Sequence, residues 1–241
     1  MRVLSFLLLM LISLPSVASV VITGTRVIYS GHQNEVGIEL KNDASQPALV
    51  QSWVDYFDEP KNKANLAVPF VVMPPVFRME ANEGQSLRLM YTQEPLPTDR
   101  ETLFRFNVLE IPPTPEAGAA NYLLMAIRNQ LKLFYRPAEI KQKPDQVEQD
   151  YIWRLQKDAT GQFILSVDNP TPFYLNLSEV NLINQAGALV AYEADMIAPK
   201  SHQQIVVKNI PSAQVQQLKT FQFVYINDYG ARVLVTAPFQ R

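Results

Sequence analysis

The sequence predicts an all-β protein built from two immunoglobulin-like β-sandwiches. Short runs rich in β-branched and aromatic residues recur along the chain, and turn residues such as Gly, Asn, Asp and Pro separate them. A polar stretch with two prolines, residues 136–150, divides these runs into two series. The first series has about seven runs, which is typical of one immunoglobulin-like sandwich.

The runs of the first series are expected to be the strands of one domain, and those of the second series the strands of another. The first series covers residues 26–30, 35–42, 48–57, 70–79, 85–92, 102–111 and 122–135. The second covers residues 151–156, 162–169, 173–183, 202–209, 220–228 and 231–239. The polar stretch, with Pro137 and Pro144, suits a linker with a stiff elbow. We therefore expect domains at residues 19–140 and 141–241, and a short helical turn at residues 212–219.

Residues 1–18 predict a secretory signal peptide. Met1 and Arg2 give a short basic start, and the apolar run of residues 3–14 is too short to span a bilayer comfortably. Ser16 and Ala18 are small residues at the positions that a signal peptidase reads. Cleavage after Ala18 would release an exported chain; the alternative is an uncleaved anchor.

Composition narrows the function classes. The chain of 241 residues is 18% charged with a net charge of −2, and it has neither a basic patch for nucleic acid nor an acidic tail. It has no cysteine, which excludes thiol catalysis and thiolate metal sites. Because His32 and His202 are the only histidines, a His-rich metal cluster is excluded and a Ser–His–acid triad has little material.

The stretch 121–137, "NYLLMAIRNQLKLFYRP", reads as one long strand that starts apolar and ends basic. It would span on the order of 55 Å, whereas a typical strand has about 5–6 residues. Leu123, Met125 and Ile127 alternate, so on the residues alone they are expected to face the core of the first domain. Ile127 and Lys132 differ in parity, so strict alternation places them on opposite faces; a bulge or a strong twist near Asn129-Gln130 would bring them to one face.

Four motifs occur in the order of one known family. They are "TRVIY" at residues 25–29, "LPTDRETLFRFNVLEIPP" at 96–113, "KLFYRP" at 132–137 and "NDYGA" at 227–231. Together they resemble the signature of the periplasmic pilus-assembly chaperones of the chaperone–usher pathway, the PapD-like family, over essentially the whole exported chain. The short connection before the long strand and the lack of cysteine resemble the short-loop branch.

The resemblance implies two sandwiches joined at an angle with a cleft between them. It implies that the long strand is lent to a pilin subunit whose own sandwich lacks a strand. The donated side chains would be Leu123, Met125 and Ile127. Arg26 and Lys132 would hold the subunit's terminal carboxylate in the cleft through charge-assisted hydrogen bonds.

The resemblance also implies an ionic network of Glu101, Arg136 and Asp228 that sets the angle between the domains. The protein would be a periplasmic chaperone and not an enzyme, without nucleotide, other cofactor, metal or small-molecule substrate. Its partners would be fimbrial subunits and an outer-membrane usher. Because an exposed apolar edge invites association, a second copy of the chain is expected to cap the strand when no subunit is bound.

Two other functions stay open on the residues alone. One is a structural subunit or adhesin of a surface fibre, which would share export, β-structure and strand exchange. Such a subunit has one incomplete sandwich, whereas this sequence predicts two. The other is an exported glycosidase, which needs paired carboxylates in one cleft. The only cluster of carboxylates that suggests such a site is Asp55, Asp58 and Glu59, and these residues are expected to form a turn.

Overall fold

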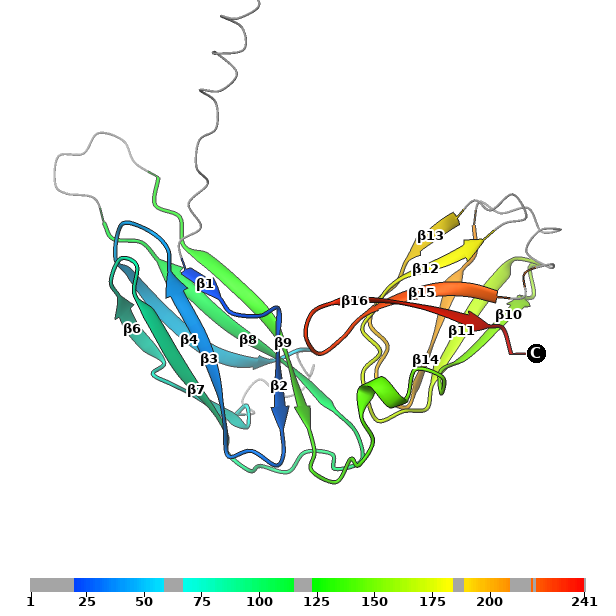
Figure 1. Cartoon of the computed structure of the whole chain (residues 1–241), viewed down its shortest axis with the longest axis horizontal. Coiled ribbons are helices and arrows are strands. Elements are labelled where there is room, and N and C mark those ends of the chain that lie inside the picture. The colour runs from blue at the N-terminus through cyan, green and yellow to red at the C-terminus, as the bar shows by residue number, and fades with distance from the viewer. Residues whose placement is uncertain are drawn as a thin grey trace, which may run out of the picture.

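The computed structural model describes residues 20–58, 67–114, 123–183, 189–208, 218 and 220–240. The regular secondary structure of the described residues is almost entirely strand, and it forms two β-sandwiches that meet at an angle (Figure 1). The predicted fold class, all-β with two sandwiches and a cleft between them, is confirmed. The expected signal peptide and most of the expected helical turn at residues 212–219 lie outside the described residues.

The first sandwich has two sheets. One sheet has the order β1-β3-β7-β5, formed by Val20–Ile22, Glu35–Asn42, Gly84–Tyr91 and Phe70–Met73. The other has the order β2-β9-β8-β4-β6, formed by Arg26–Ser30, Ile127–Arg136, Thr102–Ile111, Ala48–Tyr56 and Val76–Met79. Alternate side chains point into the space between the sheets, where Val50, Phe104 and Leu133 are fully buried.

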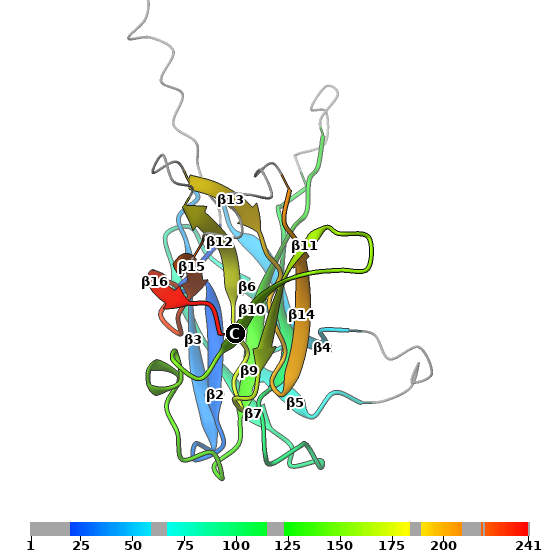
Figure 2. The ribbon, with the colours of Figure 1, turned by 90° about the vertical axis from the view of Figure 1, so that its right-hand side faces the viewer.

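The second sandwich also has two sheets, which lie on opposite sides of the domain in Figure 2. One has the order β10-β11-β14, formed by Ile152–Lys157, Phe163–Asn169 and Ser201–Val206. The other has the order β13-β12-β15-β16, formed by Leu189–Glu193, Leu177–Ile183, Thr220–Ile226 and Arg232–Pro238. Trp153 packs against Phe221 and Phe223 in the core, with ring centroids 4.8 and 5.2 Å apart.

Some expected strand boundaries were wrong. The run 70–79 is two strands, β5 and β6, in different sheets, because Pro74 and Pro75 between them cannot donate to a ladder. Two short strands, β1 and β13, were not expected.

The expected long strand 121–137 was also wrong in its first part. Strand β9 begins at Ile127, and residues 123–126 precede it outside any strand. The pairing of β9 with β8 ends at Ile127 and Glu110. Beyond that pair, β8 runs into Pro112 and Pro113, which have no N–H to continue the ladder. Asn121 and Tyr122 lie outside the described residues.

The two domains are connected by the segment between β9 and β10, which contains the short 3-10 helix η1 (Pro144–Gln146). The turn between β15 and β16 reaches back to the first domain. Its Gly230 adopts a φ of +81°, and a Cβ there would collide with the hydroxyl of Thr25, which precedes β2. Close approach of the two domains at this point therefore requires glycine.

We expect Gly230→Ala to be more destabilising than Gly161→Ala. Gly161 has a nearly equal φ of +84°, but nothing lies within 4 Å of the position of its Cβ. The left-handed conformation alone should cost roughly 1–2 kcal/mol at each site. Only Gly230→Ala must also displace Thr25. Thermal unfolding of both variants tests this, and equal losses of stability would show that Gly230 contributes nothing to domain contact.

Candidate functional site

The two cations singled out in the sequence lie side by side at the domain junction. Arg26 on β2 and Lys132 on β9 are directly opposite each other in the parallel pairing of these strands. Both extend from the face of the sheet that is turned away from the core. Arg26 Nη1 donates to the carbonyl of Ile226 at 3.2 Å, and Lys132 Nζ donates to Asn176 Oδ1 at 3.5 Å.

This cation pair has unused capacity for an anion. Arg26 Nε is buried and has no hydrogen-bond partner among the described residues. Burial lowers the pKa of Arg26, and burial together with the charge of Arg26 lowers the pKa of Lys132. Both shifts mean that the environment disfavours the charged forms. A carboxylate placed between the two side chains would offset this cost with charge-assisted hydrogen bonds.

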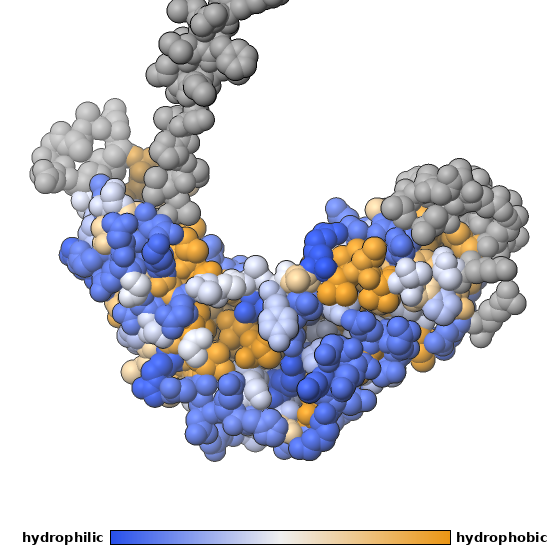
Figure 3. Space-filling model, in the orientation of Figure 1, coloured by the Kyte–Doolittle hydropathy of each residue, from blue (hydrophilic) through white to orange (hydrophobic). Residues whose placement is uncertain are grey.

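A cavity of about 910 Å³ opens beside Lys132. Its wall in the second domain includes Asn176, Glu179 and Asp195. Small-molecule pockets have volumes of about 300–1,000 Å³, so the end of a peptide chain could enter this space. Figure 3 shows the hollow between the two domains, with apolar surface on each side of it.

The three side chains expected on the donated strand are exposed. Leu123, Met125 and Ile127 expose 84, 63 and 48% of their surface. The reading from the residues alone, that they face the core of the first domain, was therefore wrong. The core ends at Leu131, and the segment before Ile127 leaves the sheet, so the described residues of the first domain leave these side chains largely uncovered.

The bulge suggested near Asn129-Gln130 was also wrong. The pairing of β9 with β8 keeps one continuous register from Ile127, opposite Glu110, to Tyr135, opposite Thr102. Side chains five residues apart on such a strand point to opposite faces. Ile127 therefore shares the side of Leu131 and Leu133, and Lys132 lies on the other side, toward the second domain.

Glu101, Arg136 and Asp228 are in contact across the junction. Arg136 Nε donates to Glu101 Oε1 at 2.8 Å, and Arg136 Nη1 donates to Asp228 Oδ2 at 3.0 Å. The other oxygen of Glu101 accepts the backbone N–H of Tyr174 at 2.8 Å. The guanidinium also lies over the ring of Phe173, 5.1 Å from its centroid. Their role in setting the domain angle stays a prediction.

Burial and charge act against each other in this network. Burial favours the neutral form of Arg136, but the two carboxylates outweigh it and raise the pKa of Arg136. Burial also raises the pKa of Glu101, against the influence of Arg136 and of the Tyr174 N–H. Removing the guanidinium would leave the carboxyl group of Glu101 buried without a counter-charge.

Several residues of the junction gave no signal in the sequence. Tyr174 packs on Phe134 with ring centroids 5.7 Å apart, and Asn176 contacts Lys132. Both come from the second domain, so only the tertiary structure brings them to the cleft. Asp55, expected in a turn, lies on β4 and belongs to a polar cluster that also includes Asn107.

Other kinds of site receive no support from the described part of the chain. It contains no group of three or more His, Cys, Asp or Glu side chains placed to hold a metal ion. A search of the same residues for a helix with the length and hydropathy of a membrane span found none.

Both domains match family models of chaperones. Residues 19–141 match the model described as "Pili and flagellar-assembly chaperone, PapD N-terminal domain". Residues 146–237 match the model described as "Pili assembly chaperone PapD, C-terminal domain". The two models together cover more than half of the chain.

Relatives and solved structures agree with these matches. The probable fimbrial chaperone YadV of Escherichia coli strain K12 is 38% identical over 234 residues, covering 95% of this chain and 94% of the relative. The chaperone protein HifB of Haemophilus influenzae is 41% identical over 219 residues, covering 89% and 85%.

Two solved structures show the same similarity. A crystal structure of the YadV chaperone has a TM-score of 0.75 at 36% identity, covering 92% of this chain and 100% of that one. The SafB chaperone in complex with the SafA pilin of Salmonella enterica has a TM-score of 0.72 at 29% identity, covering 94% and 99%.

We expect Arg136→Ala to destabilise the protein by about 3–5 kcal/mol, the usual cost of removing one partner of a buried ion pair. Lys200→Ala is the control, because the Lys200–Asp99 pair also joins the domains but is exposed; it should have little effect. Chemical unfolding measures stability, and small-angle scattering measures the domain angle. If Arg136→Ala changed neither, the role assigned to the network would be wrong.

Proposed function

This chain belongs to the PapD-like family of pilus-assembly chaperones, and we propose on that basis that it folds pilin subunits in the periplasm by strand donation. The observation that carries the proposal is the exposed apolar segment 123–127, which continues directly into β9 beside the cation pair. A family of chaperones rather than of enzymes is consistent with this function, and two chaperone domains argue against the alternative of a fibre subunit.

In the proposed strand donation, the backbone and the side chains of the segment have different roles. The backbone of the segment would add a strand to an incomplete sandwich, and Leu123, Met125 and Ile127 would fill its groove. Each fully buried apolar side chain contributes roughly 1.5–3 kcal/mol, so the three together could supply on the order of 5–9 kcal/mol before ordering costs.

The cation pair would fix the register of the added strand. A subunit whose terminal carboxylate reaches Arg26 and Lys132 has its last strand placed at one position along β9. Register is decisive, because a slip of one residue turns every side chain to the wrong face. Both cations are partly buried, and Arg26 Nε has no hydrogen-bond partner among the described residues, which supports this role.

The proposal has three further parts, which concern export, delivery of the subunit and the chain without a subunit. Residues 1–18 would direct its export to the periplasm. The loaded chaperone would deliver the subunit to an outer-membrane usher, where the next subunit would replace the donated strand. Without a subunit, a second copy of the chain would cover the apolar segment.

We expect the double variant Arg26→Ala, Lys132→Ala to lose its pilin partner in a periplasmic pull-down read by mass spectrometry. The wild-type chain should retain a one-to-one pilin-like protein. Lys41→Ala, which removes an exposed cation of β3 in the other sheet, should retain it as well. Circular dichroism confirms that the variants are folded. Equal retention by the double variant and the wild type would contradict the anchor.

We expect Met125→Ser to weaken retention of the same subunit more strongly than Leu124→Ser does. Both side chains are exposed apolar neighbours, so both substitutions remove the same kind of surface. In an extended strand only Met125 shares the side of Leu123 and Ile127. Dissociation rates of the two variant complexes give the comparison, and equal rates would mean that the segment binds without alternation.

A further inference from the structure

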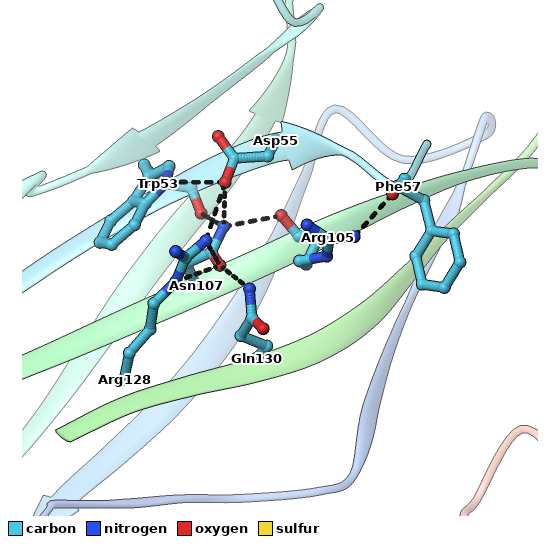
Figure 4. Close-up of polar contacts among 7 residues, drawn as sticks. All are labelled: Trp53, Asp55, Phe57, Arg105, Asn107, Arg128 and Gln130. Carbon is cyan, nitrogen blue, oxygen red and sulfur yellow. Dashed lines mark hydrogen bonds and ion pairs between the residues drawn. The ribbon is translucent and has the colours of Figure 1, made fainter. Parts of the chain in front are cut away.

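A polar cluster connects the start of β9 to the neighbouring strand β8 and to β4 beyond it (Figure 4). It lies on the face of the five-stranded sheet that is turned away from the core. Its members are Trp53 and Asp55 on β4, Asn107 on β8, and Arg128 and Gln130 on β9. None of these residues belongs to the cation pair, the ionic network or the exposed segment.

Asn107 is the centre of the cluster. Its side chain is fully buried, and its Oδ1 accepts Arg128 Nε at 3.0 Å, Arg128 Nη2 at 2.7 Å and Gln130 Nε2 at 2.9 Å. Its Nδ2 donates to Asp55 Oδ2 at 3.0 Å and to the carbonyl of Arg105 at 3.1 Å. The hydrogen bonds that reach Oδ1 from β9 therefore meet an acceptor that is itself fixed to β4 and β8.

Arg128 reaches across β8 to β4. Its Nη2 donates to Asp55 Oδ2 at 3.1 Å, and its guanidinium lies over the ring of Trp53, 5.0 Å from the centroid. Trp53 Nε1 in turn donates to Asp55 Oδ2 at 3.0 Å. Arginine suits this position because a planar guanidinium can hydrogen-bond through its fork and stack on an aromatic ring at the same time.

The position of Arg128 along β9 indicates what the cluster does. Arg128 directly follows Ile127, the first residue of β9 that pairs with β8. The pairing of β2 with β9 begins only at Lys132, so among the described strands residues 127–131 pair with β8 on one edge alone. The cluster thus secures the strand where its pairing is weakest and where the exposed segment leaves the sheet.

We propose that Arg128 is a positioning residue, which clamps the start of β9 to Asn107, Asp55 and Trp53 so that the segment 123–127 leaves the sheet in a fixed direction and register. This inference rests on the proposed strand donation. A strand that is ordered before binding loses less conformational freedom on binding, which strengthens the complex. A fixed direction also keeps Ile127 on the side of Met125.

A second arginine nearby, Arg105, makes similar contacts that do not involve β9. Arg105 on β8 also lies over an aromatic ring, that of Phe57, and donates to the Phe57 carbonyl (Figure 4). It thereby links β8 to the end of β4, and its hydrogen bond does not involve the start of β9. Arg128, by contrast, is the arginine whose hydrogen bonds join the start of β9 to both β8 and β4.

The test compares Arg128→Ala and Arg128→Lys with wild type, Lys132→Ala and the control Arg88→Ala. Arg88 forms a cross-strand ion pair with Glu35 in the other sheet, so its removal costs a similar contact without touching β9. Two quantities are measured: hydrogen exchange of the amides of residues 127–131 in the free protein, and the dissociation rate of the pilin subunit that copurifies with wild type. Thermal unfolding shows whether each variant is folded.

We expect Arg128→Ala to speed exchange at residues 127–131 and to speed subunit dissociation, each by about tenfold, which is the effect of having to order about one more residue. Arg128→Lys should restore little, because an ammonium has neither the fork nor the planar face. Arg88→Ala should match wild type in both measurements.

The outcomes separate the two hypotheses. Unchanged exchange and dissociation in Arg128→Ala, while Lys132→Ala releases the subunit, would overturn the clamp and leave the proposed function intact. A wild-type chain that holds no subunit would overturn the proposed function and the clamp's role in it. Faster exchange spread over the whole first domain would reduce Arg128 to a general stabilising residue and also overturn the proposal.

Discussion

Strand β9 is paired with β8 from Ile127 to Tyr135 but with β2 only over its second half. This asymmetry arises because the chain changes sheets between β1 and β2, so β1 pairs with β3 in the opposite sheet. The second half of β9 is therefore an internal strand, and its first half is an edge. An exposed apolar edge is normally a hazard. Here it continues into the exposed segment 123–127, and this is the feature on which the proposed strand donation rests.

Because side chains alternate along β9, the same strand contributes to the core of the first domain and to the cleft between the domains. Leu131, Leu133 and Tyr135 point into the first core. Lys132, Phe134 and Arg136 point the other way, and each contacts the second domain. An extended strand divides its residues between two faces. A shift in the register of β9 would consequently disturb the core, the cation pair and the ionic network together.

Much of this arrangement could be predicted from the sequence, because strand periodicity is a local property. The alternating runs predicted most strands, and motif resemblance predicted which side chains would lie at the junction. The polar cluster was not predicted, because its contacts depend on the register of three strands. Asn107 lies between buried Phe106 and Val108 and reads as an ordinary outward residue of β8. Nothing local indicates that Arg128, twenty-one positions later, donates to it.

Arg136 and Lys132, the two cations of β9 that contact the second domain, differ in their charged neighbours. Arg136 has carboxylates from both domains within hydrogen-bonding distance, and these raise its pKa despite burial. Lys132, four residues earlier on the same face, has an amide oxygen at 3.5 Å and a neighbouring guanidinium, and its pKa is lowered. A partly buried charge that contributed only to the fold would be expected to have its counter-charge within the protein. Arg136 meets this expectation, whereas Asp195 and Asp228 only partly offset the effect of burial on Lys132 and Arg26, whose pKa values stay lowered. This difference supports the proposal that a partner supplies a further carboxylate at the cation pair.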